Sequence, residues 1–496
     1  MDFHSFLFLL FFPAAVLGYY LLPYRVKHIW LLAASYYFYA CWNVLYVVPL
    51  LCTTVITFFC GRGIEKLHRS EGRQRVGLQK LLAAAGIFAS LAMLFLFRYL
   101  VPAAGLVETV GAWLGLSLQL PSFNLLLPIG ISFFTLQAIS YLADVHRGTV
   151  KAEKDFVQYA LFLSFFPKLA AGPVERAKGL LSQLNNPRRF NFNRALKGLM
   201  VMLWGYFLKL VIADRLAIFV GNVYGQTSTA DGMHLLIAAL LFAVQIYCEF
   251  YGYTTIALGA AKVLGINLTD SFNAPYFSIS VSEFWQNFHI SLTAWFRDYL
   301  YIPLGGNRKG KIRACLNKII VFLISGLWHG PSLTFAAWGA LNGLYLTLGS
   351  LLKPLRRKVM AMLKIKKNSA AHCLTAGLIT FLLICFSWIF FRADSIAHAL
   401  SIITGIFTGT HISALMNGSM LAYGVSSGEF ILLAVCLAIL LFAEICKFKG
   451  TVIHQWLSDQ KWLRFLAIAL TVCFILLFGV WGPGHDGSNF YYFFQF

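Results

Sequence analysis

Long apolar segments, separated by short basic or turn-rich segments, recur along the whole chain. Many approach the roughly 20 residues that a helix needs to cross a bilayer. They are continuous rather than alternating, which disfavours a membrane β-barrel. The pattern predicts an all-α, polytopic integral membrane protein with about 11 transmembrane helices plus partial or re-entrant helices. The predicted spans cover residues 5–22, 29–60 as two short helices, 81–97, 102–120, 126–148, 195–220, 233–265, 319–329, 333–352, 374–391, 429–446 and 463–482.

Two of these regions, and a third apolar segment between spans, are interrupted by polar or turn-forming residues. Residues 29–60 are broken near Trp42-Asn43 and again at Pro49, so two short or tilted helices fit better than one straight helix. Residues 126–148 scatter Ser, Thr, Gln and Asp among aromatic residues, which predicts a helix that faces protein or a cavity. Residues 165–176 contain two prolines and a glycine around a short apolar core. They predict a re-entrant or interfacial segment whose backbone is satisfied by protein or water.

The chain contains no internal repeat, and no long soluble segment interrupts the membrane pattern. We expect a single membrane domain over residues 1–496. Its catalytic core is predicted near 126–352, with N-terminal helices in 1–125 and C-terminal helices in 353–496. The first apolar run lacks the positive charge and cleavage site of a signal peptide, so it is predicted to be the first membrane helix.

Composition and charge strengthen the membrane interpretation. The chain is 59% hydrophobic and only 12% charged, and its 40 basic and 19 acidic residues give a net charge of +21. In a soluble protein such an excess would suggest nucleic acid, but here basic residues crowd short loops that the positive-inside rule places in the cytoplasm. We therefore expect no nucleic-acid partner. The predicted cytoplasmic segments are 62–80, 305–318, 354–367 and 447–461.

Polar residues inside two long apolar runs are expected to have structural roles. Lys209 is predicted to snorkel toward the membrane surface, and Asp214 to sit at a helix end. The ten cysteines lie mostly in apolar runs without a C-x-x-C, so free buried thiols are expected. The sequence predicts no disulfide framework and no metal site.

The region 280–330 contains the candidate chemistry. Ser280-Val-Ser-Glu283 matches a capping box, so a helix is predicted to begin there. Aromatic and aliphatic residues recur at helical spacing after it, and His289 falls within one turn of Trp285. The helix is predicted to run on until Pro303 and the two glycines that follow it.

Two histidines stand in this region among residues suited to lipid. A titratable ring is costly there, so His289 and His329 are predicted to face a protein interior or a wet cavity. His329 ends an apolar run, Gly330 and Pro331 stop the helix, and Ser332 is predicted to cap the next one. The pair alone leaves proton transfer, metal binding and a transport path open.

Longer strings around these histidines resemble a known family. WQNFHISLTAWFRDYLYIPLGGNR and SGLWHG are similar to the signature of the membrane-bound O-acyltransferase superfamily, and within it to the alginate O-acetyltransferase type of bacterial polysaccharide acylation. The likeness covers most of the chain. The further strings that carry it are LPIGISFFTLQAISYLADVHRG, FFPKLAAGPVER, KLVIADRLA at 209–217, SWIFFRAD at 387–394 and the C-terminal NFYYFFQF.

One departure from this family pattern is visible. Members of this type often carry a D-F-S-G-Y-S-D-like string where the present chain has Glu249-Phe-Tyr-Gly-Tyr-Thr-Thr255. The acidic residue at its end is missing, which puts details of the donor or acceptor in doubt.

The resemblance implies a fold with a central tunnel and an O-acyltransferase activity. The acyl group, acetyl in most relatives, is expected to pass from a cytoplasmic thioester to a hydroxyl on the other side of the membrane. His329 corresponds to the histidine of the W-H-G motif and His289 to that of the F-H-I-S-L motif. A neutral imidazole suits the removal of a hydroxyl proton near pH 7. We therefore expect His329 to be the base and His289 a second catalytic or orienting group.

Other residues receive supporting predictions. Trp285, Asn287 and Trp328 are expected to wall the tunnel or to bond the substrate. Arg297 and Asp298 either support the site or form a structural pair. The basic loop 305–318 lies between the two histidines, and the cations expected to approach the phosphates of the donor are Arg308, Lys309 and Lys311.

The expected donor is acyl-CoA, acetyl-CoA above all, or an acyl-carrier thioester, and no bound cofactor is expected. The predicted partners are an extracytoplasmic acyltransferase of the SGNH type or another acceptor protein, the cytoplasmic donor and membrane lipids. The predicted location is the bacterial cytoplasmic membrane. Three alternatives stay open: a D-alanyl transfer protein of teichoic acid, lipid or protein acylation by another branch of the superfamily, and a transporter or flippase. Transporters often show internal repeats, and this chain has none, which disfavours the transporter alternative.

Overall fold

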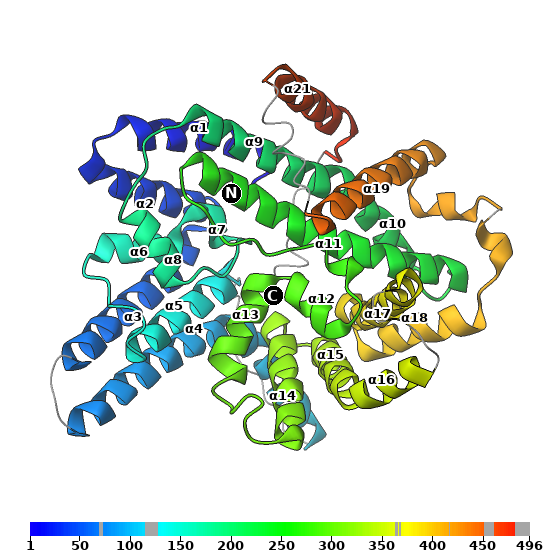
Figure 1. Ribbon diagram of the computed structural model, residues 1–496, viewed down its shortest axis with the longest axis horizontal. Coiled ribbons are helices and arrows are strands. Elements are labelled where there is room, and N and C mark those ends of the chain that lie inside the picture. Colours follow the sequence, from blue (N-terminus) through cyan, green and yellow to red (C-terminus); the bar gives the residue numbers. More distant parts are fainter. Residues whose placement is uncertain are drawn as a thin grey trace. The chain divides into compact units, whose positions relative to one another are not determined.

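The computed structural model describes residues 1–68, 73–114, 127–362, 366, 369–415, 417–450 and 461–481. Within these ranges the chain is helical and contains no strand (Figure 1). Seven helices are long and apolar enough to cross a membrane, or eight if one bent helix pair counts as a span. The predicted helical membrane class is confirmed, whereas the larger number of spans stays a prediction. The seven are Val44–His68, Arg75–Leu100, Phe192–Gly225, Gly232–Val263, Lys311–His329, Ala370–Arg392 and Ser427–Phe448.

The described chain divides into two compact units, and the first comprises Met1–Met202 and Ile256–Thr269. Its helices are α1 (Phe6–Leu21), α2 (Tyr24–Ala40), η1 (Val44–Tyr46), α3 (Val47–His68), α4 (Arg73–Trp113), α5 (Ile131–His146), α6 (Phe156–Ser164), α7 (Phe166–Leu169) and α8 (Ala177–Leu184). Two further helices, α9 (Phe192–Tyr206) and α11 (Gly232–Val263), each contribute to both units.

Local sequence signals explain the breaks in the first unit. The chain leaves α2 at Trp42 and Asn43, as predicted, and the Asn43 side chain accepts a hydrogen bond from the N–H of Leu45. The predicted second break at Pro49 is wrong. Pro49 lies in the first turn of α3, where proline is tolerated because the N–H that it lacks would have no partner within the helix.

The polar helix and the broken segment predicted from the sequence both lie inside the first unit. In α5 the polar side chains of Ser132, Thr135, Gln137 and Ser140 are buried, which confirms that this helix faces protein. The segment after it forms the four-residue helix α7, which is buried along its length. There the Lys168 Nζ donates to Oε1 of Gln137, so protein atoms satisfy a polar group at this position.

The second unit comprises Leu203–Thr255 and the described chain from Asp270 onward. Its helices, besides parts of α9 and α11, are η2 (Phe207–Ala213), α10 (Asp214–Gly225), η3 (Pro275–Phe277), α12 (Val281–Asn287), α13 (Ile290–Phe296), η4 (Arg297–Tyr301), α14 (Lys311–His329), α15 (Leu333–Leu351), α16 (Lys353–Met362), α17 (Ala370–Arg392), α18 (Ile396–Thr408), η5 (Ile412–Leu415), η6 (Ser419–Tyr423), α19 (Ser427–Phe448) and α21 (Lys461–Phe478). Of these, η2 and η4 are π-helical turns.

The helices α14 and α15 form a tight antiparallel hairpin that the sequence marks with small residues. A Cβ atom at Gly326 would lie 2.2 Å from the carbonyl oxygen of Phe335, and one at Gly339 would lie 2.3 Å from that of Phe322. Only glycine permits this approach, a common feature of packed membrane helices. The Ser332 side chain accepts from the N–H of Thr334 and caps α15, as predicted.

Lys209 does not have the role predicted for it, whereas Asp214 lies at a helix end, as predicted, because it is the first residue of α10. Lys209 lies in η2, within a long span, and is buried rather than snorkelling. Its Nζ is 2.7 Å from Oδ1 of Asp214 and 2.7 Å from Oε1 of Glu249 on α11. The three side chains form a buried ion triad, because a desolvated charge is stable only when it is paired.

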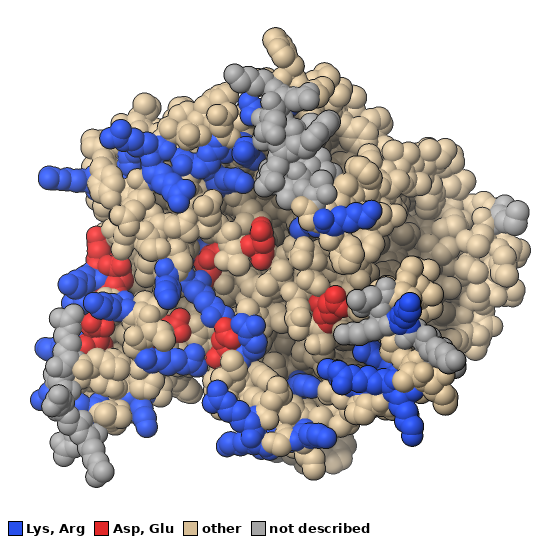
Figure 2. All heavy atoms as spheres, in the orientation of Figure 1, with Lys and Arg blue, Asp and Glu red and all other residues tan. Residues whose placement is uncertain are grey.

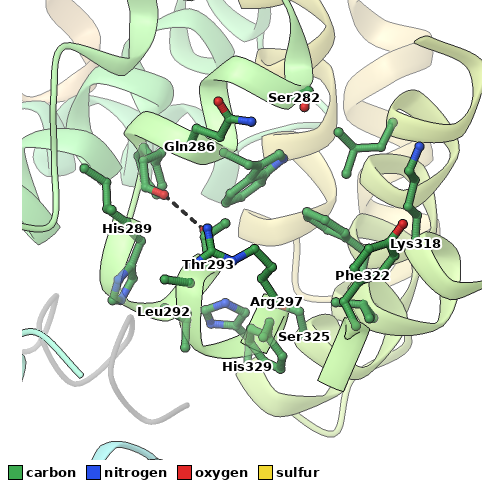
Figure 3. A pocket seen from close by; sticks show the side chains of 18 of the residues that line it. Ser282, Gln286, His289, Leu292, Thr293, Arg297, Lys318, Phe322, Ser325 and His329 are labelled. Atoms are coloured by element: carbon green, nitrogen blue, oxygen red, sulfur yellow. Dashed lines mark hydrogen bonds between the residues drawn. The ribbon is translucent and has the colours of Figure 1, made fainter. Parts of the chain in front are cut away.

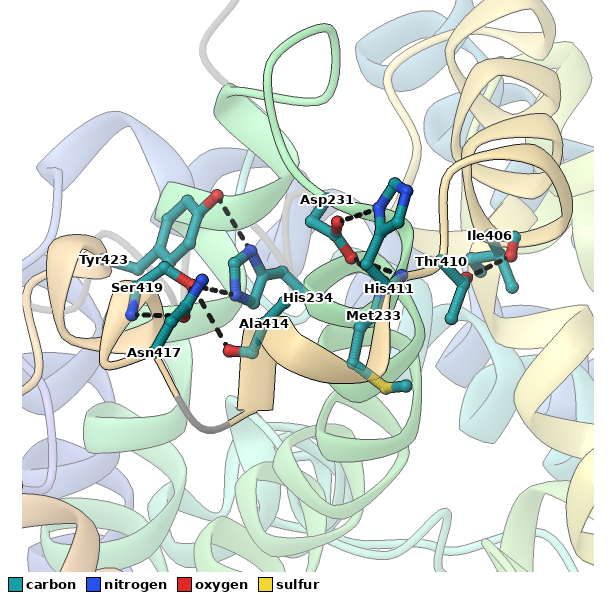
Figure 4. Close-up of polar contacts among 10 residues, drawn as sticks. All are labelled: Asp231, Met233, His234, Ile406, Thr410, His411, Ala414, Asn417, Ser419 and Tyr423. Atoms are coloured by element: carbon teal, nitrogen blue, oxygen red, sulfur yellow. Dashed lines mark hydrogen bonds and ion pairs between the residues drawn. The ribbon is translucent and has the colours of Figure 1, made fainter.

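A polar network attaches the segment between α18 and α19 to the beginning of α11 (Figure 4). His411 Nδ1 lies 2.7 Å from Oδ2 of Asp231. His234, on the first turn of α11, is 3.0 Å from Oγ of Ser419 and 3.3 Å from Oη of Tyr423. These contacts fix the course of a segment whose described residues include the short helical turns η5 and η6.

Candidate active site

The predicted continuous helix after Ser280 is interrupted at the first histidine, and this is a correction to the sequence interpretation. Ser280 caps α12 as predicted, because its side chain accepts from the N–H of Glu283. The helix ends at Asn287, and α13 begins at Ile290. His289 is therefore the residue at the turn between two short helices, not a member of a helical stripe.

Backbone hydrogen bonds from a preceding segment hold this turn in place. The N–H of Asn273 donates to the carbonyl of Asn287 at 2.9 Å, and the N–H of Ile290 donates to the carbonyl of Ser271 at 2.8 Å. These bonds satisfy a backbone carbonyl at the end of α12 and a backbone N–H at the beginning of α13, which have no partner within their helices. The turn therefore depends on residues distant from it in the sequence.

His289 has a backbone conformation that few residues other than glycine adopt, with φ of 47° and ψ of 53°. Such a conformation costs on the order of 1–3 kcal/mol and persists only where surrounding contacts hold it. Its ring packs between those of Phe250 and Phe272, with centroids 6.2 and 6.1 Å away. Burial in this setting lowers the pKa of His289 to about 4, so the imidazole is neutral at pH 7.

His329 is the last residue of α14 and lies in an aromatic environment. Its ring meets those of Trp338 and Phe391 edge to face, each with centroids 5.3 Å apart. Gly330 follows in an extended conformation, and a Cβ there would lie 2.4 Å from the ring of Phe335. The W-H-G sequence thus ends the helix and leaves the imidazole among apolar rings.

Both imidazoles line one cavity of about 650 Å³, which lies wholly within the second unit (Figure 3). Each histidine is only 7% exposed. The structure therefore brings together two residues 40 positions apart in the sequence, as predicted. A cavity of this size accommodates a small-molecule substrate.

Two rows of side chains with polar members run along the walls of this cavity. One comes from α12, α13 and η4 and comprises Ser282, Gln286, His289, Thr293 and Arg297. The other follows a single face of α14, since its lining residues recur at intervals of three or four: Lys318, Val321, Phe322, Ser325 and His329. In Figure 3, Lys318 lies away from the two imidazoles. Aromatic residues from other helices close the walls, namely Phe250, Trp338, Trp388 and Phe391.

Of the remaining predicted residues, some line the cavity and others lie outside its lining. Trp285 and Arg297 line it together with the two histidines. Asn287 is not among the lining residues and donates to Oγ of Ser278 at 3.3 Å. Trp328 is also outside the lining, and its ring packs against that of Phe296. Asp298 lies 2.7 Å from Nε of Arg297, so these two residues do form a pair.

The cations predicted to meet the donor do not line the cavity. Arg308, Lys309 and Lys311 are exposed residues at the loop and the beginning of α14. Lys318 lines the cavity instead, and its Nζ donates to Oγ of Ser350 at 2.8 Å. Sequence reasoning missed Lys318. Counting back from His329 in steps of three or four residues reaches Lys318, so the periodicity of a helix would have placed these two residues on one face.

Comparisons with known proteins match a family model and several enzymes to this chain. A family model described as MBOAT, membrane-bound O-acyltransferase family, matches residues 152–392, which include both histidines. A probable alginate O-acetylase of Pseudomonas putida is 33% identical over 86% of this chain and 81% of that protein. A peptidoglycan O-acetyltransferase of Helicobacter pylori is 32% identical, over 80% of this chain and 77% of that protein. A teichoic acid D-alanyltransferase of Bacillus subtilis is 23% identical, over 56% of this chain and 72% of that protein.

Proposed function

This chain belongs to the membrane-bound O-acyltransferase family, and from that premise we propose that it moves an acyl group, acetyl above all, from a cytoplasmic thioester to a hydroxyl of an extracytoplasmic acceptor. It is an O-acyltransferase and a multi-pass membrane protein. The observation that carries the proposal is the cavity that has two buried imidazoles and a lysine on its walls.

The length of the cavity wall supports a donor with a pantetheine arm. Along α14 the rise of about 1.5 Å per residue puts Lys318 about 16 Å from His329. A phosphopantetheine arm has about 13 bonds between phosphorus and sulfur, and by the reach of an extended polypeptide backbone these span about 15 Å. A phosphate near Lys318 would therefore place the thioester near His329. Both CoA and a carrier protein present this arm.

The proposed reaction uses the two histidines unequally. His329 takes the proton of the acceptor hydroxyl, and the resulting oxygen nucleophile attacks the thioester carbonyl carbon. The tetrahedral adduct, in which the C–O bond has formed, then breaks its C–S bond and expels the thiolate, which takes the proton held by His329. His289, held in its turn by Phe272 and its neighbours, orients the acceptor. The aromatic rings around His289 and around His329 exclude water, which would otherwise compete as the acceptor.

The proposal includes the path and the partners. A tunnel through the protein would carry the acyl group between the two sides of a bacterial cytoplasmic membrane. An SGNH-type acyltransferase or a similar extracytoplasmic protein would receive it and complete transfer to a cell-surface polymer. The names of the relatives point to alginate or peptidoglycan as classes of final acceptor. We also propose that shorter helices raise the number of spans above the seven long ones.

A reconstituted system tests the proposal. The purified protein in liposomes receives radiolabelled acetyl-CoA on one side and an alginate or peptidoglycan oligosaccharide, with or without an SGNH-type protein, on the other. We expect release of CoA and transfer of label to the acceptor side, both abolished by His329→Ala. Absence of turnover with acetyl-CoA, together with turnover of a D-alanyl carrier thioester, would instead support teichoic acid D-alanylation. Movement of intact acetyl-CoA without thioester cleavage would indicate a transporter.

A further inference from the structure

The short helix α16 follows α15 after a bend of 52°. The 19 residues of α15 already span about 28 Å, close to the thickness of a bilayer core. The ten residues of α16 reach only about 15 Å, which is too short to cross. The length of α15 alone is therefore enough for one crossing, and the bend turns α16 away from the axis of α15.

The sequence of α16 divides into a basic and an apolar face. Lys353 and Arg357 are one turn apart, with Arg356 beside them. Leu355, Val359 and Met362 share another face, since they recur at intervals of three or four residues. These three apolar side chains are 58%, 40% and 74% exposed. An apolar stripe facing outward beside a row of cations is typical of helices that lie in the membrane interface.

A second group of cations lies at the same end of the hairpin. Lys311 and Arg313 occupy the first turn of α14, and the bond from Lys318 Nζ to Ser350 Oγ ties this end to the last turn of α15. Figure 2 shows Lys and Arg side chains gathered over the region where Figure 1 places α16 and the beginning of α14. The two basic segments thus form one surface around the end of the hairpin.

The stretch of sequence that forms this surface contains no acidic residue. Between Tyr299 and Ala393 the chain has no Asp or Glu. The same stretch contains basic residues at positions 308, 309, 311, 313, 318, 353, 356, 357, 358, 364, 366, 367 and 392. A concentration of one charge without its opposite repels itself and favours an anionic partner from outside.

We propose that α16 and the first turn of α14 bind anionic phospholipid headgroups, with Leu355, Val359 and Met362 inserted among the acyl chains. Basic residues near a membrane that contains anionic lipid are attracted to it, and the attraction decays within a Debye length. The apolar stripe would contact the acyl chains of a phospholipid, whereas a soluble anion has no apolar part for it to contact. This occupant therefore fits both faces of α16, and the proposal is independent of the acyl-transfer chemistry.

Lipid selectivity tests the charged face. The full chain is reconstituted in nanodiscs of phosphatidylcholine with 30% phosphatidylglycerol, and the lipid retained after mild detergent extraction is quantified. We expect the wild type to enrich phosphatidylglycerol in a salt-dependent way. Replacing the four cations of α16 with glutamine (Lys353→Gln, Arg356→Gln, Arg357→Gln, Lys358→Gln) should reduce this enrichment about ten-fold.

A matched control removes four exposed cations of the first unit instead: Lys151→Gln, Lys154→Gln, Arg188→Gln, Arg189→Gln. It should keep the enrichment of the wild type. Equal loss in both variants, or enrichment unchanged by the α16 variant, would overturn the proposal. A raised KM for a soluble thioester donor in the α16 variant, with unchanged lipid selectivity, would do the same and assign the surface to the donor.

Insertion depth tests the apolar face. In a background where the exposed Cys41 and Cys473 are replaced by serine, an environment-sensitive dye is attached at Val359→Cys or at Arg357→Cys. We expect the dye at residue 359 to show blue-shifted emission and quenching by brominated acyl chains, and the dye at 357 to show neither. Equal water exposure at both positions would contradict the proposal. The thermal midpoint of each labelled protein verifies that it is folded.

Discussion

The indole N–H of Trp285 donates a 3.1 Å hydrogen bond to Oδ1 of Asn342, a residue 57 positions later in the sequence. Asn342 is fully buried on α15, and its own Nδ2 donates to the carbonyl of Trp338. The bond connects α12, just before the turn at His289, to the helix that packs against α14. It is a polar contact within a cluster of rings formed by Trp285, Trp338 and Trp388.

Loss of the Asn342 side chain should leave a buried donor without an acceptor. We expect Asn342→Leu to cost about 1–3 kcal/mol of stability and to reduce turnover, because α12 positions His289. Adding Trp285→Phe removes the orphaned N–H and should recover part of the thermal midpoint. The midpoint in detergent and the rate of acyl transfer provide the measurements. If Asn342→Leu alone is as stable and as active as the wild type, the bond does not have this role.

The two histidines should respond differently to replacement. His329→Ala is expected to reduce acyl transfer by about 10²–10⁴-fold, the usual effect of losing a general base. His329→Gln should restore little, since glutamine cannot accept the proton. His289→Gln should keep more activity than His329→Gln, because glutamine still bonds an acceptor. Rates are normalised to folded protein. Equal loss in both glutamine variants would mean that the pair acts as one unit.

Lys318 provides a test of where the donor enters. We expect Lys318→Gln to raise the KM for the thioester donor several-fold and to weaken its dependence on salt, with a smaller change in kcat. The matched control is the exposed triple variant Arg308→Gln, Lys309→Gln, Lys311→Gln, whose residues do not line the cavity. A larger KM effect in the control than in Lys318→Gln would place the phosphates at the loop, as the sequence interpretation had it.

The triad of Lys209, Asp214 and Glu249 should be sensitive to the loss of one member. Lys209→Met leaves two buried carboxylates uncompensated, and breaking such a pair costs about 3–5 kcal/mol. The triple variant Lys209→Met, Asp214→Asn, Glu249→Gln removes all the charge. It should therefore unfold at a higher temperature than the single variant. Thermal unfolding in detergent measures both. If the triple variant is no more stable than Lys209→Met, the ion pairs are not the cause of the loss.

The pKa of His289 predicts a pH effect on stability. Burial lowers this pKa to about 4, whereas an unfolded histidine has a pKa of about 6.5. Between these values the unfolded chain binds a proton that the folded chain does not, so stability falls as the pH falls from 6.5 to 4 and is constant above 6.5. The contribution is about 3 kcal/mol. His289→Gln should narrow the difference in thermal midpoint between pH 4.5 and 7.5. An unchanged difference would mean that His289 titrates normally.

The sequence by itself determined the membrane-helical class, the helix caps and the two histidines. These features depend on short-range patterns: apolar runs long enough to span a bilayer, Ser280 and Ser332 before helices, and Gly330 after one. Burial of the polar helix α5 was also predictable. Polar side chains among aromatic residues in a membrane must face protein, whichever partner they meet.

Tertiary structure alone decided where the helix breaks and which cations meet the cavity. The pattern around His289 favoured a continuous helix, because the backbone bonds from Ser271 and Asn273 that hold the turn come from outside it. Lys209 was expected to snorkel, since its partner Glu249 is 40 residues away on another helix. Lys318 and Arg308 look alike in the sequence, and only the packing of α14 puts one of them on the cavity wall. Each of these outcomes follows from contacts between distant segments, whose geometry local propensity does not encode.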